Sequence, residues 1–155
     1  MAEIVFICTA NMCRSPMAEG IMKKCIEEKR VEGVTVSSMG THAQEGNGAT
    51  DYAVEVCSEH GIDISHHHSR PLIPIILKQS WLIFTMEPVH IDFIDLFFPQ
   101  VADRVYMLAA WPGRKHKKAT VADPVGRSLQ VYRKTFRILE NTIEKLLPEI
   151  VVLQR

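Results

Sequence analysis

The sequence lacks the features that mark several common protein classes. Its longest apolar runs, such as "PLIPIILK" and "WLIFTM", fall well short of the about 20 residues that a membrane-spanning helix needs. Neither charge is in excess, since 18 Lys and Arg balance 18 Asp and Glu, which gives no reason to expect nucleic acid or an anionic membrane as a partner. The four cysteines do not form the dense pattern of a secreted disulfide framework, and Glu3 stands where a signal peptide would be basic. We therefore expect a soluble, cytoplasmic protein with reduced thiols.

Two ligand-binding motifs are missing as well. No G-x4-G-K-[ST] segment occurs, which excludes a P-loop nucleotide hydrolase. His60 and the run His66, His67 and His68 raise the question of zinc, but adjacent histidines point in different directions and no Cys-x2-Cys pair accompanies them. We expect neither a metal nor a cofactor, and we expect His66 and His68 to lie in solvent.

The pattern of the remaining sequence predicts a single α/β domain over residues 1–155. The chain is long enough for one core, and 46% of it is apolar. Short β-branched and aromatic runs alternate with amphipathic segments, which implies right-handed crossovers and a four-stranded parallel sheet flanked by helices in three layers, as in flavodoxin-like or Rossmann-like folds. We expect strands over residues 3–9, 34–38, 81–86 and 104–108, and helices over residues 16–30, 49–62, 87–97 and 129–146.

The segment "CTANMCRS", from Cys8 to Ser15, leaves the first expected strand at its carboxyl end, where such folds bind ligands. If it wraps into a loop ahead of a helix that starts at Pro16, its backbone N–H groups and the positive end of the helix dipole converge on one point and suit a tetrahedral dianion. Arg14 adds a planar fork of donors for two phosphate oxygens. We predict that phosphate is held by Thr9, Ala10, Asn11, Met12, Cys13, Arg14 and Ser15.

Cys8 lies at the floor of this positive site, which favours its thiolate, a nucleophile toward phosphorus. Ser15 can donate a hydrogen bond to that sulfur. A cysteine at the end of a strand is more often a small core residue, and Cys-x5-Arg alone would be weak support for a catalytic site. The strand, the Arg-Ser pair and the proline at the helix start coincide here, which favours catalysis. A silent phosphate-binding module is the alternative from another functional class.

The sequence resembles the low-molecular-weight protein tyrosine phosphatases along nearly its whole length. The likeness is carried, in order, by "VFICTANMCRSPMAEG", "SSMGTHAQEG", "GIDISHHHSRPL", "LIFTMEPVH" and "ADPVGRSLQVYRKTF". The resemblance implies that Cys8 is the nucleophile and Arg14 the phosphate clamp. It also implies that Asp123 donates the proton that the leaving group requires and then acts as base for the water that attacks the phosphocysteine.

Three further residues are expected to support the loop or to protect it. Asn11 tolerates unusual backbone angles, and the resemblance implies that it is tied to Ser15 and to His67. Cys13 either fills the loop or acts as a resolving thiol that traps the oxidised nucleophile in a reversible disulfide. Cys25 and Cys57 fall on apolar helix faces, where packing in the core is expected.

The expected pocket wall departs from the family's pattern. Ala10 replaces a usual glycine, so the backbone there must avoid positive φ. Gln44 and Val125 stand where tyrosine-specific members place aromatic residues, and each lost stacking contact is worth about 1 kcal/mol. Some bacterial relatives remove phosphate from arginine and typically carry threonine at the position of Met12. Met12 therefore favours phosphotyrosine or a small aryl phosphate, with a protein-arginine phosphatase as the first alternative.

A thiol-linked arsenate reductase of the same fold is a weaker alternative. Such enzymes need two further cysteines in the middle of the chain, and "KQSWLIFTMEPVH" has none. The basic run "RKHKK", Arg114 to Lys118, is either a solvated loop face or, because it precedes the expected acid, a patch that favours acidic substrates. We expect a metal-free cysteine phosphatase that works as a monomer or weak dimer on phosphorylated proteins or small aryl phosphates.

Overall fold

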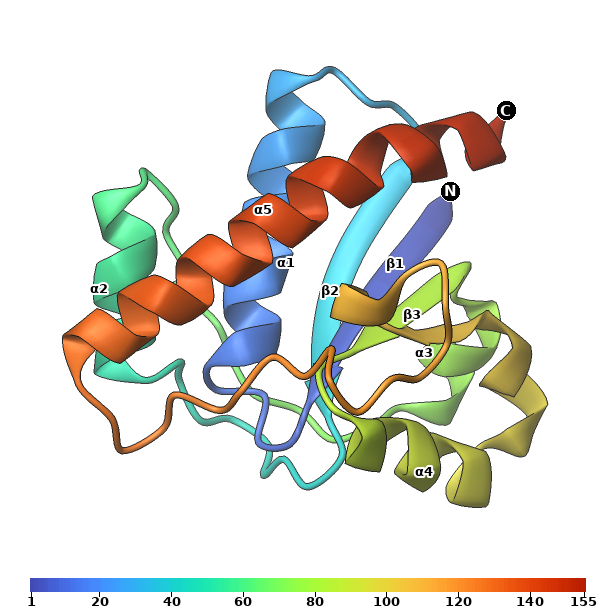
Figure 1. Ribbon diagram of the computed structural model, residues 1–155, viewed down its shortest axis with the longest axis horizontal. Helices are drawn as coiled ribbons and strands as arrows, with labels where there is room; N and C mark the ends of the chain where they lie inside the picture. Colours follow the sequence, from blue (N-terminus) through green and yellow to red (C-terminus); the bar gives the residue numbers. More distant parts are fainter.

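The chain folds around a four-stranded parallel sheet, and the computed structural model describes all of residues 1–155 (Figure 1). The strand order is β2-β1-β3-β4. Since β1 has β2 on one side and β3 on the other, the chain order reverses beside β1, so the carboxyl end of β1 is a topological switch point. The predicted fold class is confirmed. The strands are β1 (Ala2–Cys8), β2 (Val34–Gly40), β3 (Leu82–Thr85) and β4 (Val105–Met107).

Helices cover both faces of the sheet, which gives the expected three layers (Figure 1). One face is covered by α1 (Arg14–Glu28), α2 (Asp51–Glu59) and α5 (Leu129–Gln154). The other is covered by α3 (Pro74–Gln79) and α4 (Pro88–Phe97), with a short 3-10 helix at Pro99–Arg104. A second 3-10 helix, Leu108–Ala110, follows β4 and packs its buried Leu108 into the core beneath α1 and α5. None of the helices has the length and apolar character needed to cross a bilayer.

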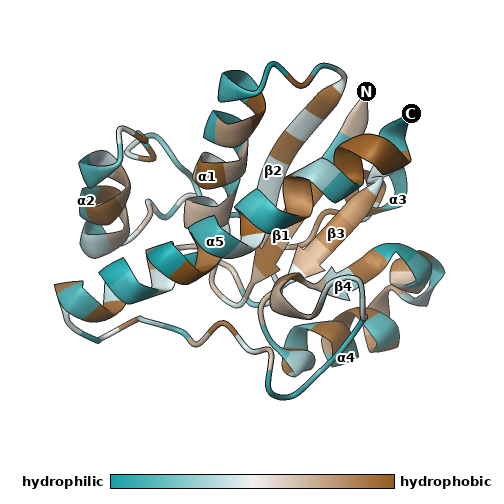
Figure 2. Cartoon of the chain, turned by 45° about the horizontal axis from the view of Figure 1, so that its top comes forward, coloured by the Kyte–Doolittle hydropathy of each residue, from teal (hydrophilic) through white to brown (hydrophobic).

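The central strands are buried on both sides, as their continuous apolar runs predict. Phe6 and Phe84 point toward α1 and α5, where their rings stack with centroids 5.8 Å apart. Val5 and Ile83 point to the opposite face and pack under α3 and α4. Figure 2 shows the hydrophobic colouring of β1 and β3, and the alternation of hydrophobic and hydrophilic positions along α5. Buried apolar side chains thus form one cluster on each face of the sheet. Together the two clusters hold the strand ends, and the loops that follow them, in place.

Several element boundaries differ from expectation, among them those of α1, of α5 and of α2, which is shorter at both ends than the expected 49–62. Helix α1 begins at Arg14 because the N–H of Met17 already donates to the carbonyl of Cys13 (3.1 Å), so Pro16 is its third residue and still lies where no N–H is needed. Helix α5 continues through Pro148 to Gln154. The six residues of α3 were not expected, since so short a helix shows no periodicity.

We predict that Gly40 cannot be replaced by alanine without moving the loop that follows β1. Gly40 pairs with Cys8, and a Cβ at this position would lie 2.5 Å from the carbonyl oxygen of Thr9 and 2.9 Å from the backbone nitrogen of Asn11. Overpacking against backbone typically costs about 1–3 kcal/mol, so the Gly40→Ala variant should unfold at lower urea concentration. Gly48→Ala is the matched control, because no atom lies within 4 Å of its added Cβ. Equal midpoints for the two variants would contradict the predicted clash.

Candidate active site

The loop from Cys8 to Arg14 joins the carboxyl end of β1 to the start of α1, as the sequence predicts. Asn11 is the residue of this loop with a positive φ, 57°, and Ala10 avoids that region as expected. The first amides of α1 and the positive end of its dipole lie at the same end of the sheet as the sulfur of Cys8. This arrangement suits an anion with several oxygen atoms.

Cys8 is the candidate nucleophile, and Ser15 lies directly beside it. The Sγ atom of Cys8 is 3.0 Å from the Oγ atom of Ser15, and both residues are almost completely buried. A hydroxyl donor at this distance stabilises a thiolate and makes it a better leaving group. The contact between these two residues, predicted from the sequence, is present.

Arg14 lies inside the protein with its guanidinium held from one side. Its Nη1 atom donates to Oε2 of Glu87 (2.7 Å) and to the carbonyl of Val121 (3.0 Å). Only 2% of the Arg14 side chain is exposed, so Glu87 supplies the counter-charge that a buried cation requires. The contacts of Nη1 leave Nε and Nη2 free of strong partners, so these two donors can form the fork that binds phosphate oxygens.

Asp123 comes from the loop before α5 and reaches the same guanidinium. Its Oδ2 atom lies 3.6 Å from Nη2 of Arg14, and its Oδ1 atom accepts a hydrogen bond from the backbone N–H of Val125 (3.0 Å). About two-fifths of the Asp123 side chain is exposed, so the carboxyl group faces the opening of the site. Two residues far apart in the sequence, Arg14 and Asp123, are thereby brought together.

Asn11 is held from behind by a buried polar network. Its Nδ2 atom donates to the hydroxyl oxygens of Ser15 (2.8 Å) and Ser38 (2.9 Å), and the Ser38 hydroxyl donates to Glu19 (3.0 Å). Nε2 of His67 lies 2.7 Å from the carbonyl of Asn11, so this nitrogen carries the proton. The predicted ties of Asn11 to Ser15 and His67 are present, and the network fixes the left-handed turn of the loop.

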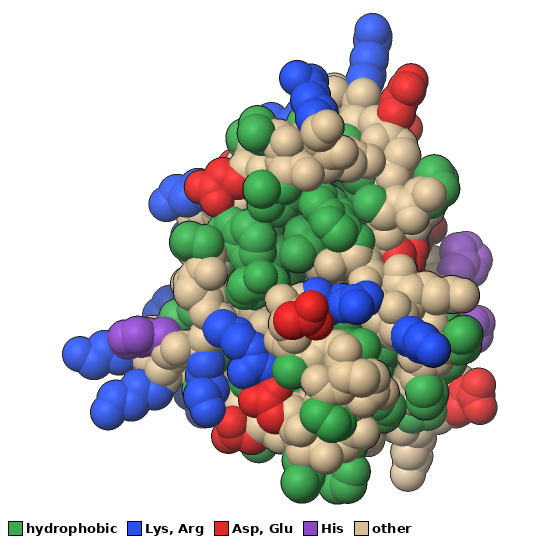
Figure 3. All heavy atoms as spheres, turned by 90° about the vertical axis from the view of Figure 1, so that its right-hand side faces the viewer, with side chains coloured by type: hydrophobic (Ala, Val, Ile, Leu, Met, Phe, Trp, Pro, Cys, Tyr) green, Lys and Arg blue, Asp and Glu red, His purple; other side chains and the backbone are tan.

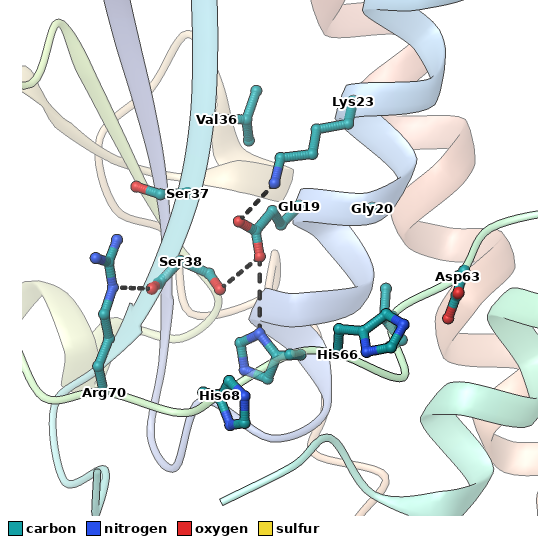
Figure 4. A pocket seen from close by; sticks show the side chains of 12 residues that line it. Glu19, Gly20, Lys23, Val36, Ser37, Ser38, Asp63, His66, His68 and Arg70 are labelled. Carbon is teal, nitrogen blue, oxygen red and sulfur yellow. Dashed lines mark hydrogen bonds and ion pairs between the residues drawn. The ribbon is translucent and has the colours of Figure 1, made fainter. Parts of the chain in front are cut away.

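A polar cavity of about 510 Å³ is lined by members of this network, Glu19, Ser38 and His67. Figure 4 shows Glu19 at its centre, close to Lys23 (3.1 Å) and to Ser38. Because Cys8, Arg14 and Asp123 do not line this cavity, it is separate from the candidate active site.

His90 anchors the other end of the loop. Its Nδ1 atom accepts hydrogen bonds from the backbone N–H groups of Met86 (3.3 Å) and Glu87 (3.1 Å), so Nε2 carries the proton and donates to the hydroxyl of Thr9 (2.9 Å). Burial and the nearby Arg14 cation lower the pKa of His90 from 6.5 to about 4. His90 is therefore a neutral structural link between the loop and the start of α4.

Cys13 belongs to the loop, and its side chain is buried and contacts two hydroxyl groups. Its sulfur lies 3.3 Å from the Thr50 hydroxyl and 3.3 Å from the Tyr132 hydroxyl, which are 3.1 Å from each other. Burial is the largest influence on Cys13 and raises its pKa, and burial likewise raises the pKa of Tyr132 to about 12. Cys13 is thus held as a thiol in this conformation.

The residues predicted to line the pocket wall lie at the surface or the edge of the core. Met12 is partly buried and packs against the core, Gln44 is exposed, and 57% of Val125 is exposed. Met12 belongs to the loop between Cys8 and Arg14, and the backbone N–H of Val125 donates to Asp123, so these two residues lie beside the candidate site. The backbone carbonyl of Gln44 accepts from the hydroxyl of Ser69 instead.

The remaining residues singled out in the sequence lie away from this chemistry. Cys25 and Cys57 are buried in the core and His66 and His68 are exposed, as predicted. All four cysteines are free. No group of three or more His, Cys, Asp or Glu side chains lies close enough together to hold a metal ion.

The geometry combines a buried sulfur, a fork of cationic donors and an exposed carboxyl group around one opening. A comparison with known protein families adds the deciding observation: the model described as low molecular weight phosphotyrosine protein phosphatase matches residues 3–154.

The chain belongs to this family. The resemblance predicted from the sequence is confirmed, and the protein is a phosphatase.

Relatives of this phosphatase are similar over their whole length. A protein-arginine-phosphatase of Bacillus subtilis is 34% identical over 148 residues, which cover 96% of each chain. A probable low molecular weight protein-tyrosine-phosphatase of Erwinia amylovora is 29% identical and covers 92% of this chain and 93% of its own. The solved structure of a low molecular weight protein tyrosine phosphatase from T. tengcongensis is 35% identical, covers 96% of this chain and 99% of that one, and superposes with a TM-score of 0.88.

Sequence reasoning did not identify several supporting residues of this phosphatase. Glu87 and His90 follow the carboxyl end of β3, beside β1, and that position could have pointed to them. Ser38 lies near the carboxyl end of β2, the other neighbour of β1, so its position could have pointed to it in the same way. Glu19 lies on α1, one turn after Ser15, and carries no signal that separates it from an ordinary surface glutamate.

We predict that His90 makes the stability of this phosphatase depend on pH between about 6.5 and 4. The folded pKa lies below the unfolded value, so over this interval the unfolded chain binds a proton that the folded protein does not. Stability is therefore lost as the pH falls from 6.5 toward 4, by up to about 3 kcal/mol. Urea denaturation of the wild type and of the His90→Asn variant at pH 7 and pH 4.5 measures this contribution.

The variant should lose less stability than the wild type between these two pH values, whatever its stability at pH 7. His66→Asn removes an exposed histidine and serves as the matched control. A pH dependence of His90→Asn equal to that of the wild type would show that His90 does not titrate in this way.

Proposed function

We propose that this phosphatase hydrolyses phosphotyrosine in proteins, or small aryl phosphates, in two steps through a phosphocysteine. The observation that supports the proposal most directly is the meeting of Arg14 and Asp123, at 3.6 Å, over the loop that carries Cys8. A clamp for the phosphate, a nucleophile and an acid then surround one opening. The whole chain, residues 1–155, acts as the phosphatase domain in this proposal.

In the first step the thiolate of Cys8 attacks phosphorus while Arg14 and the loop amides bind the non-bridging oxygens. The bond between phosphorus and the phenolic oxygen breaks, and Asp123 transfers its proton to that oxygen. In the second step a water molecule attacks the phosphocysteine, Asp123 takes up a proton from this water, and the sulfur leaves as a thiolate that Ser15 stabilises. The first step releases the phenol, and the second releases inorganic phosphate.

A protein-arginine phosphatase is the second candidate. Two relatives at 34% identity, from Bacillus subtilis and Geobacillus stearothermophilus, are named protein-arginine-phosphatases. Asp123 could also face the guanidinium of a phosphoarginine, because its carboxyl group is exposed beside Arg14. Met12, which replaces the threonine expected in such enzymes, favours the aryl phosphate instead. An arsenate reductase or a silent phosphate-binding module has no comparable support.

The catalytic assignments predict a sharp division between binding and turnover. Cys8→Ser should abolish hydrolysis of p-nitrophenyl phosphate but retain binding of inorganic phosphate, because the loop amides and Arg14 remain. Asp123→Ala should lower kcat by about 10²- to 10⁴-fold, the usual effect of a lost general acid. Steady-state kinetics and calorimetric phosphate binding measure the two effects.

Asp103→Ala removes an exposed carboxyl group elsewhere on the protein and should leave kcat unchanged. Wild-type turnover by Asp123→Ala would show that another group donates the proton. EDTA should not change the rate, because no metal takes part in these steps.

The substrate is best decided by a panel of phosphotyrosine, phosphoarginine and phosphoserine peptides of one sequence. We expect the highest kcat/KM for phosphotyrosine, and we expect Met12→Thr to shift the ratio toward phosphoarginine. A wild-type preference for phosphoarginine would replace our first candidate by the second. A further reaction contains arsenate and a thiol donor, and we expect the protein not to reduce arsenate.

We further propose that the phosphatase works in the cytoplasm as a monomer or weak dimer, without a cofactor and without nucleic acid or membrane partners. Its four free cysteines and balanced charge support this setting. A reversible disulfide between Cys8 and Cys13 would require Cys13 to leave its two hydroxyl partners. Activity that fails to return with dithiothreitol after peroxide treatment would rule out such protection.

A further inference from the structure

The loop that carries Asp123 is strongly basic, although the protein as a whole has no net charge. Residues 112–128 contain five Lys and Arg side chains and a single acidic one, Asp123 itself. Figure 3 shows basic side chains and a histidine projecting side by side from one edge of the molecule. In Figure 1 this loop, in orange, runs across the carboxyl ends of the strands on its way to α5.

The first two basic residues of the loop have partners within the protein. Arg114 forms a two-pronged salt bridge with Asp95, and Nζ of Lys115 lies 2.9 Å from Oδ1 of Asp92. Both aspartates lie on α4. These contacts attach the start of the loop to the fold and cancel two of its charges.

Lys117, Lys118 and Arg127 form no salt bridge, and all three are exposed. Lys117 and Lys118 occupy the two central positions of a tight turn, which the N–H of Ala119 closes by donating to the carbonyl of His116 (2.9 Å). Side chains at these positions point away from the turn into solvent. Their charge is available to another molecule.

The turn is held in a defined conformation. Nδ1 of His116 accepts a hydrogen bond from the backbone N–H of Lys118 (3.1 Å), and the hydroxyl of Thr120 donates to the carbonyl of Lys117 (3.3 Å). A preorganised turn loses less entropy on binding than a flexible segment, so the two lysines can contribute to affinity.

The turn is also attached to the catalytic centre. The N–H of Val121 donates to the carbonyl of Met86 (2.9 Å), and the carbonyl of Val121 accepts from Arg14. Asp123 follows Lys118 by five positions in the chain, so their Cα atoms lie less than about 18 Å apart. An extended peptide bound by its phosphate could reach the turn with residues within about five positions of the phosphorylated one.

We propose that Lys117 and Lys118 form a docking site for acidic residues that flank the phosphorylated residue of a protein substrate. The inference rests on the proposed function, since it names the class of phosphoprotein that the same catalytic site selects. Carboxylates of the substrate pair with the two ammonium groups, while Arg127 adds positive charge on the other side of Asp123. Charges of this kind raise the rate of encounter and lower KM without touching the reacting atoms.

The test compares three phosphotyrosine peptides that carry Asp and Glu, Gln, or Lys beside the phosphorylated residue, at 20 mM and 300 mM salt. At low salt we expect kcat/KM for the acidic peptide to exceed that for the Gln peptide about tenfold, with most of the difference in KM. High salt should reduce the preference, because the Debye length falls from about 20 Å to about 5 Å. If phosphoarginine is the better substrate, the same three flanking sequences are made with phosphoarginine.

The double variant Lys117→Glu/Lys118→Glu should lose the preference for the acidic peptide and keep the wild-type kcat on p-nitrophenyl phosphate. Lys29→Glu/Lys78→Glu carries the same change of charge and is the control. Lys29 follows the far end of α1, about 20 Å from its first residue, and Lys78 lies on α3, just before the amino end of β3. This control should retain the preference.

Equal kcat/KM for the three peptides, or a preference that the Lys117→Glu/Lys118→Glu variant retains, would overturn the docking site. If the control variant lost the preference for the acidic peptide to the same extent, the docking site would also be overturned, because the effect would then come from net charge. Each of these results leaves hydrolysis of p-nitrophenyl phosphate intact, whereas absence of that activity in the wild type would instead refute the proposed function.

Discussion

The buried guanidinium of Arg14 is the constraint on which the rest of the site depends. A cation that is 2% exposed requires a counter-charge and several hydrogen-bond acceptors, and it finds them in Glu87, the carbonyl of Val121 and Asp123. These groups come from the segment after β3 and from the loop before α5. One arginine therefore joins three separate parts of the chain, and the same contacts orient the donors that we propose bind phosphate.

The loop around the phosphate site is shaped from two sides. Behind it, Asn11 is held by Ser38 and His67, which allows this residue to keep its positive φ. In front, the neutral imidazole of His90 binds the hydroxyl of Thr9 and is fixed in turn by two backbone N–H groups. A loop held in this way needs little reorganisation when charge develops on the phosphate, which is the condition for electrostatic stabilisation of a transition state.

The proposed substrate preference depends on a different part of the molecule. Gln44 and Val125, which stand where the family resemblance leads us to expect aromatic residues, are both exposed. With less stacking to bind the phosphorylated side chain, contacts farther from the phosphate gain in relative importance. The two unpaired lysines of the turn at 117–118 are suited to provide such contacts, because they belong to the same loop as Asp123, the proposed acid.

The sequence by itself was enough to predict the fold class and the loop from Cys8 to Arg14, because these depend on local patterns and on a short motif with a chemical purpose. The role of Asp123 as acid came from the family resemblance and stays a prediction. The sequence did not reveal Glu87, His90, Ser38 or Glu19. Each of these residues acts through a partner that is 19 to 81 positions away in the chain. Nothing in the local sequence separates a glutamate that neutralises a buried arginine from one on the surface. Only the packing of the strand ends into one edge of the sheet brings such groups together, since contact between distant residues is a property of the folded chain.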